Sequence, residues 1–151
     1  MDVYLDATLD KYRVAIHVDF ILEVLELTSD DKSQSNDALE GKHVLWRDMP
    51  VPLVDLVSEV RASDRVSWTR GIVLNEPAAP RLDPVLVAAD TVHEVRRLAD
   101  ERFERIPVNS ECLDRYFDGV CYLEEESTSL FRLRAPGVWK HLFAVGDGGP
   151  K

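Results

Sequence analysis

The chain has 151 residues, of which 45% are hydrophobic and 30% charged, as in an ordinary globular protein. Its 18 basic and 28 acidic residues give a formal charge of −10, which opposes binding to nucleic acid or to anionic membrane surfaces. No run is long and apolar enough for membrane insertion, and the acidic start MDVYLDATLD lacks a signal-peptide pattern, so we expect a cytoplasmic protein.

Short runs rich in β-branched and aromatic residues dominate the first half of the chain. They predict strands at 3–5, 12–18, 23–27, 43–46 and 51–54. Pro50 and Pro52 mark the last of these as an edge or irregular strand, because proline cannot donate to a β-ladder. The polar stretch 28–42 is predicted to be an exposed loop, and Asp55 is predicted to cap a short helix ending near residue 61.

The second half of the chain follows the same plan. Strands are predicted at 71–74, 85–89 and 94–98, and the segment 75–84, which contains three prolines, is predicted to be a loop. A closing hairpin is predicted from 120–123 and 130–133 across the acidic turn 124–129. Residues 135–151 are predicted to form a C-terminal tail.

The sequence repeats itself once, at an offset of 71 residues. Residues 14–27 (VAIHVDFILEVLEL) and 85–98 (VLVAADTVHEVRRL) align without a gap and share five residues: Val14/Val85, Asp19/Asp90, Glu23/Glu94, Val24/Val95 and Leu27/Leu98. Each copy indicates a strand, an aspartate that turns the chain, and a second strand, so each half is expected to have its own small sheet. The predicted fold class is mainly β, with two small barrel subdomains at about 12–68 and 69–134 in a single domain of residues 1–134, and one or two short helices.

No pattern of catalytic or cofactor-binding residues is found in the sequence. The four histidines are isolated, and none has the spacing of a zinc site. The sequence has no GxSxG, P-loop or GxGxxG pattern. We therefore expect no metal, no cofactor and no enzymatic activity.

Four segments in order resemble the CheW family of chemotaxis coupling proteins: ILEVLEL at 21–27, WRDMPVPLVDL at 46–56, VLVAADTVHEV at 85–95 and DRYFDGV at 114–120. The resemblance covers most of residues 12–133 and implies two five-stranded barrels packed around a shared hydrophobic region. It also implies a non-enzymatic adaptor in a chemosensory array. Members of the family bind the cytoplasmic signalling tip of a chemoreceptor (a methyl-accepting chemotaxis protein) and the regulatory domain of the CheA histidine kinase.

The resemblance assigns receptor binding to three residues. Val24 and Glu26 match the strand that helps to form the receptor groove, and Arg47 matches the arginine of the family's Asn-Leu-Arg-Gly segment. We expect Glu26 and Arg47 to pair, because adjoining strands place a carboxylate beside a guanidinium fork. An exposed Arg–Glu pair can also be merely solvated, and Val24, Val51 and Leu53 can be core residues instead of a partner surface. An exposed apolar cluster between the barrels would favour the partner surface.

Three departures from the family bear on function. Asp48 stands where the family has a glycine, and Leu86 stands where many relatives have a glycine. The chain is also several residues shorter between Ile106 and Tyr116, in the loop that the family uses for a second kinase contact. Ile106, Pro107 and Val108 are our candidates for that contact.

Two alternatives to a full coupling protein stay open. The first alternative is a protein that binds receptors but not the kinase, because its loop is shorter, and that limits array growth. The other alternative is a small-ligand-binding β-barrel that shares only the architecture, since a fold does not fix a function. A deep polar pocket with a perturbed titratable group would favour the latter.

Overall fold

A computed structural model describes residues 1–27, 43–54, 56, 69–78, 83–106 and 113–139. Most of these residues lie in ten strands, which include every strand predicted from the sequence. A short helix, α3 (Leu113–Tyr116), precedes β9. The predicted loop at 28–42 and the predicted helix after Asp55 lie outside the described residues, apart from Leu56. In the described part of the chain, no helix has the length and apolar character needed to span a membrane.

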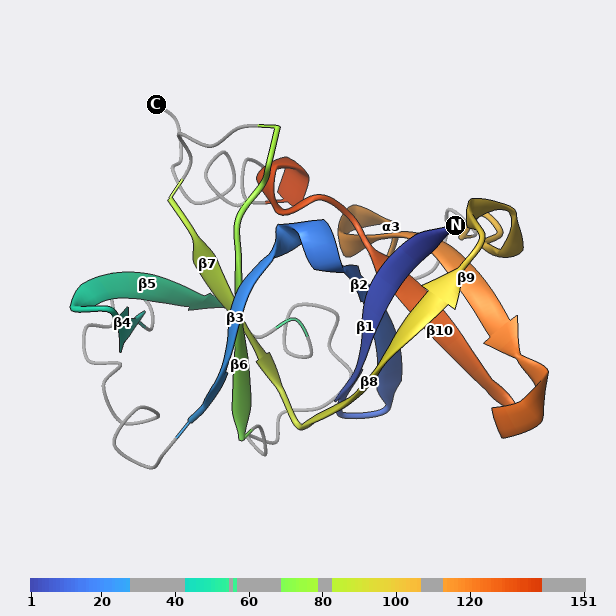
Figure 1. Cartoon of the computed structure of the whole chain (residues 1–151), viewed down its shortest axis with the longest axis horizontal. Coiled ribbons are helices and arrows are strands. Elements are labelled where there is room, and N and C mark those ends of the chain that lie inside the picture. The colour runs from blue at the N-terminus through green and yellow to red at the C-terminus, as the bar shows by residue number, and fades with distance from the viewer. Residues whose placement is uncertain (28–42, 55, 57–68, 79–82, 107–112, 140–151) are drawn as a thin grey trace.

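The strands form two curled five-stranded sheets, which lie side by side in Figure 1. The first sheet has the order β8-β1-β2-β10-β9, with bounds Thr91–Leu98, Asp2–Leu9, Tyr12–His17, Thr128–Leu133 and Phe117–Leu123. The second has the order β3-β6-β7-β5-β4, with bounds Ile21–Glu26, Arg70–Leu74, Val85–Ala89, Met49–Val54 and His43–Trp46.

The two sheets have the same topology, which confirms that the chain is built from two related halves. Strands β1–β5 correspond in order to β6–β10, and each sheet has one parallel pair, β2–β10 in the first and β5–β7 in the second. The two repeat copies form β2–β3 and β7–β8. Asp19, in the 3₁₀ turn η1 (Val18–Phe20), and Asp90, at a bend before β8, lie where the chain turns, as predicted.

The halves exchange strands. In each repeat copy the chain leaves one sheet after the first strand and enters the other sheet with the second. The segment 12–68 therefore places β2 in the first sheet and β3, β4 and β5 in the second. The segment 69–134 places β6 and β7 in the second sheet and β8, β9 and β10 in the first. The expectation that each half forms its own sheet is wrong, because the link within each repeat crosses between the sheets.

Buried apolar side chains form three clusters. One consists of residues from the first sheet, including Tyr4 and Leu130, and another of residues from the second sheet and its flanks, including Val73 and Leu86. The largest cluster lies between the sheets and takes residues from both. Each sheet therefore has its own interior, and the two sheets share a third core.

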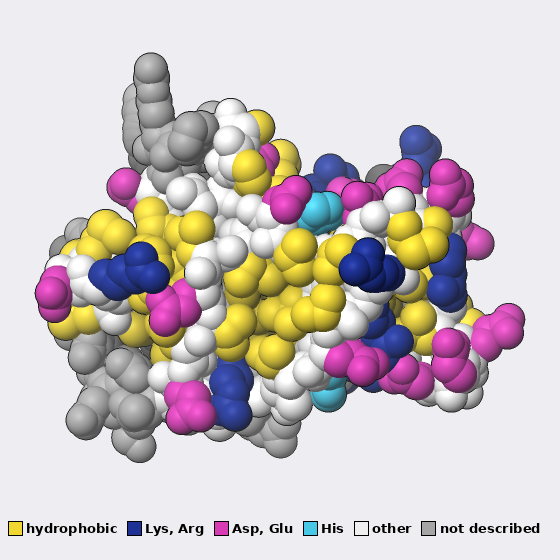
Figure 2. All heavy atoms as spheres, viewed as in Figure 1, with side chains coloured by type: hydrophobic (Ala, Val, Ile, Leu, Met, Phe, Trp, Pro, Cys, Tyr) yellow, Lys and Arg dark blue, Asp and Glu magenta, His cyan; other side chains and the backbone are white. Residues whose placement is uncertain are grey.

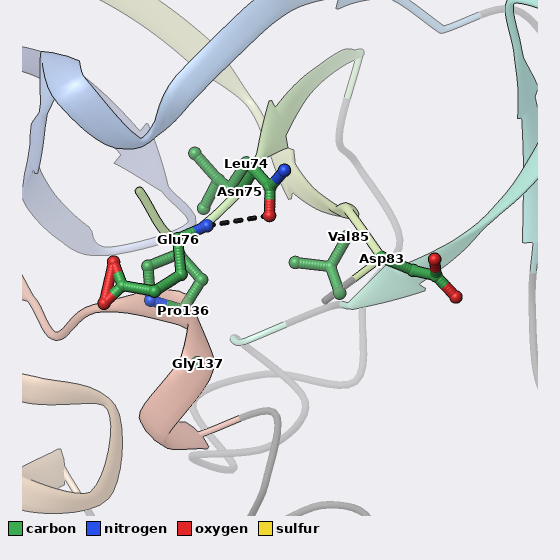
Figure 3. Close-up of a pocket in the computed structure, with 7 residues that line it drawn as sticks. All are labelled: Leu74, Asn75, Glu76, Asp83, Val85, Pro136 and Gly137. Carbon is green, nitrogen blue, oxygen red and sulfur yellow. Dashed lines mark hydrogen bonds between the residues drawn. The ribbon is translucent and has the colours of Figure 1, made fainter. Parts of the chain in front are cut away.

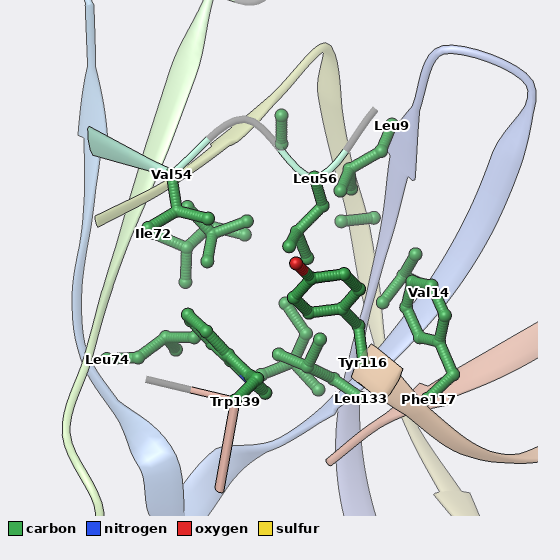
Figure 4. Close-up of a cluster of buried hydrophobic side chains, with 14 of the residues drawn as sticks. Leu9, Val14, Val54, Leu56, Ile72, Leu74, Tyr116, Phe117, Leu133 and Trp139 are labelled. Carbon is green, nitrogen blue, oxygen red and sulfur yellow. The ribbon is translucent and has the colours of Figure 1, made fainter. Parts of the chain in front are cut away.

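Trp139 belongs to the shared core, although it lies in the segment predicted to be a tail. A helical turn at 136–139 follows β10 and leaves the Trp139 side chain fully buried. Figure 4 shows its ring beside Leu74 and Leu133, and its centroid is 6.2 Å from that of Tyr116. The folded domain therefore extends at least to Trp139.

Leu86 fills space that a glycine leaves open. Its side chain, which stands where many relatives of the family have a glycine, is fully buried in the second sheet. A Cβ atom on Gly71, in the neighbouring strand β6, would lie 2.7 Å from Leu86 Cδ2. Gly71 therefore accommodates the leucine.

The first sheet encloses a buried ion cluster around Asp6, which is fully buried. The Asp6 carboxylate accepts hydrogen bonds from Arg13 Nε at 2.9 Å and from Arg96 Nε at 2.7 Å. Both arginines also contact Glu126 in the turn η3 (Glu124–Glu126). Burial raises the pKa of the Asp6 carboxyl, but the hydrogen bonds from Arg13 and Arg96 outweigh it and hold the pKa below its usual value.

Candidate partner-binding face

Strand β3 presents apolar side chains to the outside of the protein. Its residues alternate between partly buried and exposed, as in a strand with one face on a core. Leu25 packs against the core of the second sheet, whereas Leu22 and Val24 are 47% and 40% exposed. Val24 is therefore a surface residue. Val51, which is buried, and Leu53, which packs against the same core, are core residues.

Strand β8 adds an exposed valine at the equivalent position of the repeat. Val95 corresponds to Val24 and is 59% exposed. Figure 2 shows hydrophobic side chains gathered near the middle of one face of the molecule, where Figure 1 shows β3 and β8. We call Leu22, Val24 and Val95 the β3/β8 face. The sequence analysis missed Leu22 and Val95, although the repeat had already aligned Val95 with Val24.

Arg47 lies in the tight turn between β4 and β5. Arg47 and Asp48 connect the strands with φ angles of 53° and 64°, so both have the left-handed backbone of a type I′ hairpin turn. Glycine and asparagine adopt this conformation most easily, and aspartate tolerates it. Asp48 thus adopts a backbone conformation that the glycine of the family would adopt without strain.

We had expected Arg47 to pair with Glu26, but it pairs with Glu23 instead. The distance from Arg47 Nη2 to Glu23 Oε1 is 3.4 Å, and Trp46 Nε1 donates to the same oxygen at 2.8 Å. Glu26 faces Arg70 across the β3–β6 pair. The expectation failed because Glu23 and Glu26 are three residues apart in a strand, so their side chains point to opposite faces.

Arg47 is displayed to solvent by this arrangement. Its guanidinium stacks over the Trp46 ring at 4.7 Å from the centroid, and its side chain is 70% exposed. An exposed ion pair such as Arg47–Glu23 contributes only about 0 to 1 kcal/mol to stability. The guanidinium can therefore exchange Glu23 for an acidic group of a partner at low cost.

The candidate kinase contact is only partly described. Ile106 is 6% exposed and packs in the shared core, so its side chain is not on the surface. Pro107 and Val108 lie outside the described residues. A kinase contact through Pro107 and Val108 therefore stays a prediction.

Two observations on the described residues bear on metal binding and on acid–base chemistry. They contain no group of three or more His, Cys, Asp or Glu side chains that could hold a metal ion. A shallow pocket lies where the loop after β6 meets the 136–139 turn, and Figure 3 shows its carboxylates, Glu76 and Asp83, on opposite sides. These two groups are therefore not placed as an acid–base pair.

Comparison with known proteins supports the fold. No protein-family profile and no curated protein matches the sequence. The structure is similar to the crystal structure of the scaffolding protein TtCheW from Thermoanaerobacter tengcongensis, with a TM-score of 0.71 and 15% sequence identity over 88% of this chain and 84% of that one. The chain therefore has a CheW-like fold, as the resemblance of the four segments had implied.

Proposed function

We propose that the chain is a non-enzymatic adaptor that couples chemoreceptors to a CheA-type histidine kinase in the cytoplasm. The observation that carries this proposal is the β3/β8 face, which exposes Val24, a residue that the CheW resemblance assigns to the receptor groove, together with Leu22 and Val95. Large apolar side chains that are exposed on the same face of a protein mark an interaction site. The CheW-like fold supports the same function.

The face suits a helical partner. Apolar residues of a receptor helix would pack on Leu22, Val24 and Val95, in the manner of a helix that lies in an apolar groove. Burying the exposed part of one such side chain contributes on the order of 1 kcal/mol. Glu26 and Arg47 would form part of a polar rim, which contributes more to orientation than to affinity.

A calorimetric titration in two stages tests the proposal. The protein is titrated with an isolated chemoreceptor signalling tip, and the kinase regulatory domain is then added to the same cell. We expect heat of binding in both stages, and weaker receptor binding for Arg47→Glu, in which the charge of an exposed rim residue is reversed. The proposal would be overturned if the folded protein bound neither the receptor tip nor the kinase regulatory domain.

The same titration separates the full adaptor from the receptor-only alternative. Binding of the receptor tip without any later kinase signal would indicate a protein that occupies receptors and limits array growth. The shorter segment after Ile106 is the observation that favours this alternative. A kinase signal would eliminate it.

A further inference from the structure

Two adjoining pockets of about 300 Å³ each lie beside the link η1 between the sheets. The first is lined mainly by the first sheet, including Tyr4 and Arg132, and the second by η1 and the loop after β6. His17 and Phe20 line both pockets, so the two lie on either side of these side chains. Neither pocket is lined by a residue of the β3/β8 face.

The pockets are strongly acidic. Asp2, Asp100 and Asp118 line the first pocket, and Asp19 and Glu76 line the second. Arg132 is the single Lys or Arg among the lining residues, so the formal charge is five negative and one positive, or −4. A cavity lined by one sign of charge concentrates ligands of the opposite sign.

Arg132 does not neutralise the whole site. It donates to Asp118 and to Asp100, each at 2.7 Å, and stacks over the Phe103 ring at 4.5 Å. Among the described residues, the carboxylates of Asp2 and Asp19 form ion-pair contacts only with His17, at 3.6 Å and 3.7 Å. The carboxylates on either side of His17 are therefore available to a cationic ligand.

Part of the pocket wall is formed by the rings of Tyr4, His17 and Phe20. The His17 ring lies edge-on to Tyr4, with 5.3 Å between centroids, and 5.8 Å from Phe20. The Asp19 N–H donates to His17 Nδ1 at 3.1 Å and thereby fixes the orientation of the imidazole. Such walls suit the methylene stems of lysine and arginine, and aromatic faces attract their charged ends.

Tyr4 adds a requirement for a hydrogen-bond acceptor. Its side chain is 2% exposed, and its hydroxyl accepts a hydrogen bond from Arg132 Nη1 at 3.4 Å. The hydroxyl hydrogen has no acceptor among the described residues, although buried donors are nearly always paired. Burial raises the pKa of Tyr4, so the hydroxyl keeps this hydrogen at neutral pH.

We propose that the two pockets bind a short basic segment of a partner protein, with one cationic side chain in each pocket and a backbone carbonyl that accepts the Tyr4 hydrogen. Lysine and arginine side chains satisfy the carboxylates but contain no acceptor, whereas a peptide supplies both groups. A peptide therefore fits the site better than a simple amine. The site is separate from the β3/β8 face, so the proposal does not depend on receptor binding.

An NMR titration of the ¹⁵N-labelled protein tests this proposal. The probes are acetyl-Lys-Ala-Lys-amide, its Glu-Ala-Glu counterpart and n-butylammonium. We expect the basic peptide to shift the amide signals of His17, Phe20 and Ala78, and its affinity to fall as salt is raised. The acidic peptide should give no shifts, and the amine should bind more weakly than the basic peptide.

Matched variants distinguish a site from general attraction to an acidic protein. Asp2→Asn/Asp19→Asn should weaken peptide binding several-fold, whereas Glu124→Gln/Glu125→Gln, which removes two charges from the exposed turn η3, should not. Tyr4→Phe should weaken binding of the peptide but not of the amine. Each variant must first give a spectrum of folded protein. Equal loss in both double variants, or shifts that avoid His17 and Phe20, would overturn the proposal.

Discussion

Packing of Leu86 against Gly71 gives a prediction that can be worked out in detail. In Gly71→Ala the new methyl group would lie 2.7 Å from Leu86 Cδ2 and 3.1 Å from Leu86 Cγ. Carbon atoms pack at about 3.5 to 4.0 Å, so the leucine has to move in a core where it is fully buried. Overpacking of this kind costs about 1 to 3 kcal/mol, partly offset by about 0.4 to 1 kcal/mol because alanine restricts the unfolded chain. We expect Gly71→Ala to lower the free energy of unfolding by about 1 to 2 kcal/mol.

A double-mutant cycle tests whether Leu86 is the cause. Leu86→Ala alone should cost about 2 to 5 kcal/mol because it leaves a cavity. In Gly71→Ala/Leu86→Ala the new methyl group enters that cavity, so the loss should be smaller than the sum of the two single losses by at least about 1 kcal/mol. Leu130→Ala is the matched control, because Leu130 is equally buried but lies in the core of the other sheet.

The assay is denaturant-induced unfolding followed by circular dichroism, with the free energy extrapolated to water. Gly71→Ala and Leu130→Ala should be additive within about 0.5 kcal/mol. If Gly71→Ala is as stable as the wild type, or if it is additive with Leu86→Ala, the packing argument is wrong.

Three further predictions concern stability and use the same assay. Asp6→Asn should lower the free energy of unfolding by up to about 3 to 5 kcal/mol, because the partly buried Arg13 and Arg96 lose their buried charge partner and keep only Glu126. Since folding lowers the Asp6 pKa below the ordinary 3.8, this stabilisation is complete above pH 3.8 and is lost as the pH falls through the folded-state pKa. The difference in free energy of unfolding between Asp6→Asn and the wild type should therefore narrow below pH 3.8. A difference that stays constant with pH would contradict the charge argument. Trp139→Ala should cost about 3 to 5 kcal/mol, whereas an unchanged midpoint would mean that the 136–139 turn is dispensable. Asp48→Gly should raise stability by up to about 1 kcal/mol because φ is 64° at this position, and a loss of stability would show that the aspartate side chain has another role there.

Much of the fold follows from local patterns in the sequence. Runs of β-branched residues located each strand of the described residues, because side-chain alternation and turn residues act over a few positions. The repeat predicted two related halves, and the identical topology of the sheets confirms this. The exchange of strands between the halves could not be predicted, because the path of a short link such as η1 depends on contacts between residues far apart in the chain.

The candidate site was predicted less well, for related reasons. Val24 was left open between the core and a partner surface, and the structure shows that it is exposed. The expected partner of Arg47 was wrong because the residues were matched to a family motif without counting the alternation of β3. Trp139 was assigned to the tail 135–151, which follows the last predicted strand at 130–133. Trp139 is buried because it packs in the core that the two sheets share, and this core forms only in the tertiary structure. The ion cluster around Asp6 likewise joins residues up to 120 positions apart, Asp6 and Glu126.

The most direct test of the adaptor proposal is the affinity of the protein for an isolated chemoreceptor signalling tip when the β3/β8 face is made charged. Val24→Glu and Val95→Glu are compared by calorimetry with Val138→Glu, which changes an exposed valine outside β3 and β8. We predict that each of the first two variants weakens binding at least about tenfold, since a charge must then be buried in the apolar contact. Val138→Glu should bind like the wild type. Unchanged affinity in both Val24→Glu and Val95→Glu would contradict the assignment of this face as the receptor-binding surface.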